Sequence, residues 1–242
     1  MTRGEEVYDV LRAELLNGML KPGDKLRMVE LALRFSVSQS VVREGLTRLA
    51  EQGLVVATPQ RGFRVRELSV EDVVGLTESR VEIESVALRL AIERGDVRWE
   101  TEIVAAHHLL ERTPVVDDDG NYREEWGVRH RNFHQALTVG CNNARLYGVV
   151  LGLRDSAELY RRWWWAMADT GQRDLAAEHR QLKDLILARD GDGAIEALTS
   201  HIRRAPDQLI AYAHEHGLDD LNTPPPPDSS RKQRRGRRAR RK

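Results

Sequence analysis

The chain has 242 residues, carries 38 Lys and Arg against 38 Asp and Glu, and contains one cysteine, Cys141. This length allows two modest domains with separate cores, and a single cysteine excludes an internal disulfide. No apolar run approaches the roughly 20 residues of a membrane span and no secretory pattern opens the chain, so we expect no membrane association and a cytoplasmic location.

The formal net charge of zero hides an uneven distribution along the chain. Residues 1–68 carry a net charge of +2, residues 69–227 carry −10 and residues 228–242 carry +8. Because acidic surfaces repel phosphates, we expect nucleic-acid contacts at the two ends of the chain and not in its middle.

Residues 26–66 show the pattern of a helix, a tight turn, a second helix and a short β-hairpin. The first part has apolar residues at helical spacing, and Ser38 is a good N-cap for the second helix. Gly53 ends that helix, and Arg61-Gly62 marks a turn between two short apolar β runs.

The second helix of this pattern opens with polar side chains and continues with two outward arginines. A polar helix beside a basic hairpin tip suits base edges in the major groove and the adjacent phosphates. The alternative is a helical hairpin whose charges only solvate it. The predicted DNA contacts are Ser38, Gln39, Ser40, Arg43, Arg48, Arg61 and Gly62.

Residues 17–26, 38–55 and 61–62 resemble the winged helix-turn-helix of GntR-family transcriptional regulators. The resemblance implies that residues 1–68 form a domain that binds double-stranded DNA, with a homodimer on a near-palindromic operator. The sequence departs from the family at Gln39, Val41 and Gly45, where Arg, Pro and Ala are usual. Because Gln pairs best with adenine and Arg with guanine, Gln39 predicts an operator unlike those of relatives.

Residues 69–221 predict an all-α antiparallel bundle, which makes the protein mainly α. Short loops with Gly, Asn or Asp separate the helices, as antiparallel neighbours require. We expect six helices, over residues 70–94, 99–112, 122–139, 144–167, 172–189 and 192–215.

Arg80 occupies a position on the apolar stripe of the first of these helices. A buried arginine is costly unless an anion meets it. Glu84, one turn later, can form an internal ion pair with it. Alternatively, the guanidinium holds a carboxylate-bearing ligand in bidentate fashion. Arg80 and Glu84 are therefore candidate contacts of a small organic acid effector.

Three consecutive tryptophans, Trp163, Trp164 and Trp165, lie on the predicted fourth helix. Their side chains point about 100° apart, so they cannot share one core face. At least one faces a pocket, a dimer partner or solvent, and Trp164 is our candidate effector contact.

Four histidines from three predicted helices point to the interior of the bundle: His130, His134, His179 and His201. A single inward histidine is usually a hydrogen-bonded core residue. Four of them are hard to satisfy separately and easy to satisfy with one divalent transition metal.

Several stretches of this region resemble the FCD effector domain of the FadR-like branch of the same family, namely residues 78–87, 132–137, 141–146, 178–180 and 200–201. The resemblance implies that residues 69–221 bind an effector and dimerise, that His134, His179 and His201 hold a divalent metal, usually zinc or nickel, and that Asn143 is a further candidate effector contact. His130 stands where the family has an Asp ligand. Either four imidazoles bind the metal, or His130 swings away and water or the effector completes the shell.

Residues 222–242 open with a proline run and end in a basic segment, which predicts a disordered linker and tail. The tail either attracts DNA phosphates or is a solvated terminus without a required role.

Two other classes of protein compete with a regulator. In a metal-dependent hydrolase, the His130–His134 spacing would need a Glu as general base where Arg131 stands. A DNA architectural protein acting through its tail leaves Arg80 and the histidines unexplained. We therefore predict a ligand-responsive, nucleoid-associated transcription regulator, a repressor, and not an enzyme.

Overall fold

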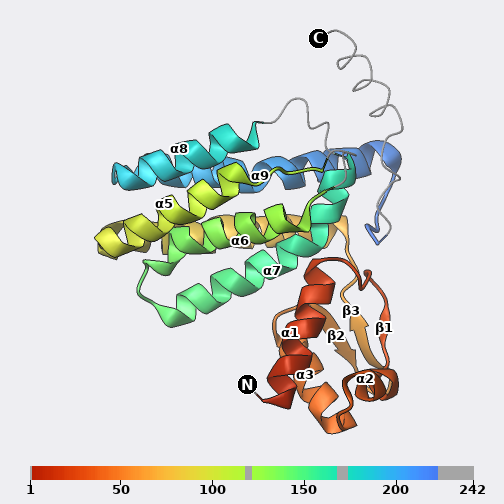
Figure 1. Ribbon diagram of the computed structural model, residues 1–242. Coiled ribbons are helices and arrows are strands. Elements are labelled where there is room, and N and C mark those ends of the chain that lie inside the picture. Colours follow the sequence, from red (N-terminus) through yellow and green to blue (C-terminus); the bar gives the residue numbers. More distant parts are fainter. Residues whose placement is uncertain (1, 118–121, 168–173, 223–242) are drawn as a thin grey trace.

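The computed structural model describes residues 2–117, 122–167 and 174–222, and the side chains of α7 (Ala144–Met167) as far as residue 160. A small N-terminal domain lies at one end of a helical bundle (Figure 1). The basic tail predicted to attract DNA falls outside these residues. Within the described ranges, no helix is both long and apolar enough to cross a membrane.

The N-terminal domain is a winged helix-turn-helix, as the sequence predicts. Its helices are α1 (Arg3–Leu16), α2 (Met28–Phe35) and α3 (Gln39–Glu51), and its strands are β1 (Lys25–Leu26), β2 (Val55–Thr58) and β3 (Gly62–Val65). The strands form an antiparallel sheet in the order β1-β3-β2. Neither α1 nor β1 was predicted from the sequence.

Local signals set the turn between the two helices. Ser36 adopts the left-handed conformation (φ 53°) and ends α2, and the Ser38 hydroxyl accepts a hydrogen bond from the Val41 amide and caps α3. The apolar side of α3 is then buried through Val42 and Leu46, both 0% exposed.

The bundle contains the six predicted helices, with no end displaced by more than three residues. They are α4 (Val70–Arg94), α5 (Val97–Arg112), α6 (Glu124–Val139), α7, α8 (Leu175–Leu187) and α9 (Gly191–His216). Side-chain caps start five of them: Ser69, Asp96, Asn143, Asp174 and Asp190 each accept a hydrogen bond from a first-turn amide. The predicted mainly α fold is confirmed.

The first and last helices of the bundle run antiparallel. The start of α4 lies beside the end of α9, where Ser69 pairs with Asp220, and Arg89 near the other end of α4 forms an ion pair with Asp192. The Leu221 amide also donates to the Leu68 carbonyl (2.8 Å). The chain therefore returns to the domain junction after completing the bundle.

One apolar core cluster spans both domains. Leu11 and Leu46 of the winged helix-turn-helix belong to the same buried cluster as Leu159 of α7 and Leu209 of α9. A second cluster, around Phe133, fills the far part of the bundle. The two domains therefore share buried surface at their junction.

An ion pair adds to this junction. Arg12 on α1 donates from Nε (2.9 Å) and Nη2 (2.6 Å) to the two carboxylate oxygens of Asp155 on α7. Asp155 is only 3% exposed. Because a buried carboxylate needs a cation and hydrogen-bond donors, this contact fixes α1 against α7.

Arg12→Ala should lower the free energy of unfolding by about 2–4 kcal/mol, because it leaves Asp155 buried without its cation. Denaturant titration measures the change. Arg3→Ala is the control, since the Arg3–Glu6 pair is well exposed and should contribute little. Equal stabilities of Arg12→Ala and Arg3→Ala would contradict a stabilising role for the junction ion pair.

Candidate functional sites

The start of α3 presents the side chains predicted to contact DNA. Ser38, Gln39, Ser40 and Arg43 are all exposed, whereas the opposite side of α3 is buried against α1. This half of the helix is free to enter a groove, with Gln39 at its first position.

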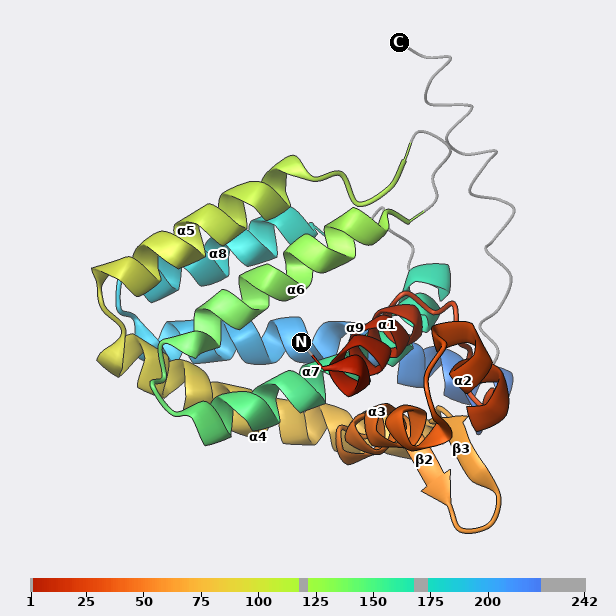
Figure 2. The same ribbon diagram turned by 60° about the horizontal axis from the view of Figure 1, so that its bottom comes forward.

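The tip of the β2–β3 hairpin forms a second exposed element, which projects away from the bundle (Figure 2). Gln60 and Gly62 both have positive φ (61° and 83°), and Arg61 between them is exposed. A Cβ at Gly62 would meet no atom within 4 Å. The backbone conformation of the turn, and not lack of space, therefore favours glycine there.

Arg48, one of the predicted DNA contacts, does not point outward as the sequence predicts. Its guanidinium lies over the Tyr8 ring, 4.1 Å from the centroid, and the residue is half-buried. This cation–π contact holds Arg48 against α1 instead of directing it outward.

The four inward histidines meet inside the bundle. His130 and His134 come from α6, His179 from α8 and His201 from α9, and one nitrogen of each lies within 4.8 Å of the others. Nε2 of His130 and Nε2 of His134 are 3.1 Å apart. Trp126 stacks on the His130 ring with 4.7 Å between centroids and so restrains that ring.

These residues fit a divalent transition metal. With metal–nitrogen bonds of about 2.0–2.1 Å, two ligands of a tetrahedral site lie roughly 3.3 Å apart, close to the observed Nε2 separation. Burial, followed by the neighbouring His130, lowers the pKa of His134 well below its ordinary value. His134 is therefore neutral at pH 7, as a ligand must be. Among the described residues, none forms a hydrogen bond with its buried Nδ1.

Glu178 orients one of the imidazoles. Its Oε2 lies 2.9 Å from Nδ1 of His201, and its Oε1 accepts from Arg204. A carboxylate acceptor places the proton on Nδ1 and leaves the Nε2 lone pair for a metal, an arrangement typical of histidine ligands.

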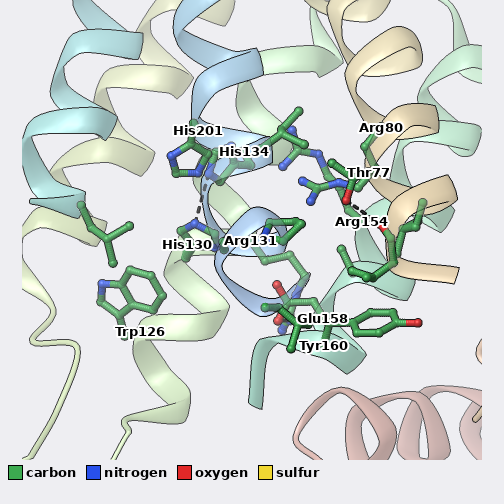
Figure 3. Close-up of a pocket in the computed structure, with 18 residues that line it drawn as sticks. Thr77, Arg80, Trp126, His130, Arg131, His134, Arg154, Glu158, Tyr160 and His201 are labelled. Carbon is green, nitrogen blue, oxygen red and sulfur yellow. Dashed lines mark hydrogen bonds and ion pairs between the residues drawn. The ribbon is translucent and has the colours of Figure 1, made fainter. Parts of the chain in front are cut away.

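A cavity of about 120 Å³ adjoins the histidines (Figure 3). His130, His134 and His201 lie on one side of it and Arg80 and Arg154 on the other. Its lining combines these groups with Arg131, Glu158, Thr77, Trp126 and Tyr160 and with the apolar residues Val73, Leu76, Ala157, Leu175, Ile202, Ala205, Pro206 and Leu209.

The internal ion pair considered for Arg80 is present, and the carboxylate ligand stays a prediction. Its Nε donates to Oε1 of Glu84 (2.8 Å), and its side chain also lines the cavity. Glu84 is 0% exposed, and its other oxygen accepts from Arg154. Glu84 is not a lining residue, so the prediction that it contacts the effector is wrong. It positions the two arginines instead.

The remaining two predicted effector contacts have different outcomes. Asn143 is exposed and lies outside the cavity lining, and its Oδ1 accepts from the Leu146 amide (3.1 Å), so it caps the first turn of α7. This structural role corrects the prediction. The side chain of Trp164 lies outside the described residues.

Three further lining residues, Arg154, Glu158 and Arg131, were not predicted from the sequence. Arg154 is one turn from the buried Val150, so the signal that identified Arg80, a charge on an apolar stripe, was present here too. Burial lowers the pKa of Arg154 to about 10, so it stays cationic at pH 7. Arg131 Nη1 lies 3.7 Å from Glu158 Oε2. Burial, opposed by Arg131, raises the pKa of Glu158 to about 7.

Together these residues place His134, a neutral imidazole, and the arginines Arg80 and Arg154 around one cavity. Neutral imidazoles leave the full charge of a bound metal, and Arg80 and Arg154 add two cations against Glu84. Such a site attracts an anion that can also ligate the metal.

Sequence comparisons identify the class of protein. Residues 3–65 match the gntR family of bacterial regulatory proteins, and residues 75–204 match the FCD domain. The chain belongs to the GntR family of transcription regulators and carries an FCD domain. Members of this family bind operator DNA, FCD domains bind small-molecule effectors, and these proteins are not enzymes.

Two relatives match over most of their length. The chain is 35% identical over 218 residues to the HTH-type transcriptional regulator BphR of Paraburkholderia xenovorans (strain LB400), covering 88% of this chain and 86% of BphR. It is 31% identical over 198 residues to the HTH-type transcriptional repressor GlaR of Escherichia coli (strain K12), covering 81% and 90%. The E. coli McbR/YncC structure shares the fold, with a TM-score of 0.70, 22% identity and coverage of 90% and 99%.

Glu158→Gln should flatten the pH dependence of stability. The ordinary pKa of a glutamate is 4.5, and in the folded protein that of Glu158 is raised to about 7. The stability gained from the protonated carboxyl is therefore present below about pH 4.5 and lost as the pH rises through about 7. Between these limits wild type should lose up to about 3 kcal/mol relative to Glu158→Gln, which cannot ionise.

Denaturant titrations of both proteins from about pH 4.5 to pH 8 measure this difference. Glu196→Gln serves as control, because Glu196 is exposed on α9. Parallel stability curves for wild type and Glu158→Gln would show that Glu158 ionises in the folded protein as easily as in the unfolded chain.

Proposed function

We propose that this protein is a homodimeric repressor whose helical domain binds a divalent metal, zinc or nickel, and a carboxylate-bearing effector. One observation carries the proposal: three of the four clustered histidines, His130, His134 and His201, line the same cavity as Arg80 and Arg154. Structural ion pairing accounts for one arginine, because Glu84 supplies one negative charge to both Arg80 and Arg154. An effector carboxylate supplies the second.

The metal ligands in this proposal are His134, His179 and His201, with His130 as the fourth. Imidazole suits zinc and nickel better than magnesium or calcium, which prefer oxygen ligands. The metal would supply a cation that an effector carboxylate can ligate. The chain's own part is to keep His134 neutral through burial and to orient the His201 ring through Glu178.

The DNA contacts in this proposal are Ser38, Gln39, Ser40 and Arg43 in the major groove, and the turn at Arg61 and Gly62 against the adjacent backbone. The exposure of Ser38, Gln39, Ser40, Arg43 and Arg61 supports this placement. Two winged helices in a dimer imply a near-palindromic operator, and basic residues 228–242 add attraction to phosphates at any sequence. The relative GlaR is named as a repressor, which supports the same role here.

His179→Ala should abolish stoichiometric metal binding and lower the melting temperature of the metal-loaded protein, because it removes one ligand from a buried set. Elemental analysis and thermal unfolding measure the two effects. Glu178→Gln should keep the fold and weaken metal binding about 10-fold, since it removes the carboxylate that orients His201.

His130→Asp serves as the matched comparison at the position of the fourth proposed metal ligand. A carboxylate ligand adds negative charge beside the cation, so this variant should retain the metal and bind an anionic effector more weakly. Wild-type protein that contains no metal, and that melts at one temperature with or without added zinc or nickel, would refute the metal site.

Arg43→Ala should weaken binding to an operator selected from random DNA by about 1–3 kcal/mol, because it removes a base or phosphate contact. Fluorescence anisotropy measures affinity for the operator and for a scrambled duplex. Arg3→Ala is the control, since Arg3 is exposed on α1 and outside the proposed contact surface. Deleting residues 224–242 should instead weaken binding to both duplexes alike and reduce the salt dependence of that binding. Unchanged operator affinity in Arg43→Ala would remove α3 from the interface.

A further inference from the structure

On its α4 and α9 sides, the effector cavity is polar at one end and apolar at the other, while α7 adds Glu158 and Tyr160 near the apolar end. On α4, Val73 and Leu76 precede Arg80, and on α9, Ala205 and Leu209 follow His201; all of them line the cavity. Because α4 and α9 are antiparallel, the polar residues of both helices lie at one level and the apolar residues toward the junction with the winged domain. Seven residues of helix span about 10 Å.

The apolar end reaches the contact between the two domains. Val73 and Leu209 belong to the buried cluster that the winged domain shares. Tyr160, which also lines the cavity, donates its hydroxyl hydrogen to Asp72 Oδ2 (2.6 Å), and this hydroxyl lies 3.3 Å from the Ser69 amide nitrogen. Ser69 stands where the chain passes from one domain to the other.

The charges that line the cavity also differ between its two ends. Arg80 and Arg154 share one Glu84, so the polar end keeps one positive charge from the protein alone. Arg131 and Glu158 form a pair that supplies no net cation when Glu158 is ionised. Figure 3 shows Glu158 beside Tyr160, where it would repel a second carboxylate.

We propose that the effector is a monocarboxylate with an apolar chain or ring, bound with its carboxylate at Arg80, Arg154 and the histidines. Its apolar body extends along Leu76, Ala205 and Pro206 toward the domain junction. This inference rests on the proposed function and names the chemical class of its ligand. A polyhydroxylated acid would have to bury hydroxyls against these side chains.

The test uses the full chain loaded with zinc and a homologous series of acids: acetate, butyrate, hexanoate and octanoate. Isothermal titration calorimetry should show Kd falling about fourfold per added methylene, equivalent to about 0.8 kcal/mol, until the chain fills the cavity. Gluconate has the same number of carbons as hexanoate and should bind at least about tenfold more weakly.

Ala205→Phe should shorten the cavity from its apolar end. It should weaken the binding of hexanoate and octanoate at least about tenfold and leave the affinity for acetate unchanged, because each buried methylene contributes about fourfold in affinity. Ala211→Phe is the matched control, since Ala211 is exposed on the same helix. This variant should bind every acid of the series with the affinity of wild type.

Two negative results are distinguishable. Zinc-dependent binding of gluconate that is tighter than that of hexanoate would overturn the apolar effector and leave the proposed function intact. If no carboxylate binds and zinc is not retained, the proposed function itself fails. Titration of wild-type protein with the series of acids distinguishes these two results even if Ala205→Phe does not fold.

Discussion

The burial of Glu84 between Arg80 and Arg154 is the interaction on which the helical domain depends. A carboxylate with no exposed surface is tolerated only because two guanidinium groups neutralise it and donate hydrogen bonds. The pairing also joins α4 to α7. Since two cations meet one anion, the same interaction that makes the core possible leaves a positive charge facing the cavity. Stability and the proposed anion binding thus depend on one cluster.

Much of this architecture could be predicted from sequence because its causes are local. Ser38 and Ser69 cap helices within their own first turns, and the histidine cluster follows from stripes on separate helices. Apart from Asn143, which caps its own first turn, the failures involve contacts between residues far apart in the sequence. The Arg48 guanidinium lies over the ring of Tyr8, far earlier in the chain, and Arg154 lines the cavity while it pairs with Glu84 on another helix. Charge pattern along one helix does not reveal such partners.

Helix α7 connects the cavity to the winged domain through adjacent residues. Arg154 lines the cavity, and Asp155 forms the ion pair with Arg12 on α1. Consecutive helical residues point about 100° apart, so one helix can contact both partners at once. A carboxylate that binds Arg154 therefore acts on the helix that holds the winged domain. It changes DNA affinity only if it binds the two arrangements of that domain with different affinity.

The size of these interactions limits what an effector can do. Coupling between sites is typically about 1–3 kcal/mol. Burying one large apolar side chain contributes about 1.5–3 kcal/mol, and the cluster at the domain junction contains many of them, Leu11, Leu46, Leu159 and Leu209 included. An effector of ordinary affinity cannot separate the two domains against that cost. It can only select between closely related orientations in which the shared cluster stays buried. In the proposed homodimer such a small rotation suffices, because two recognition helices must match two half-sites at a fixed spacing.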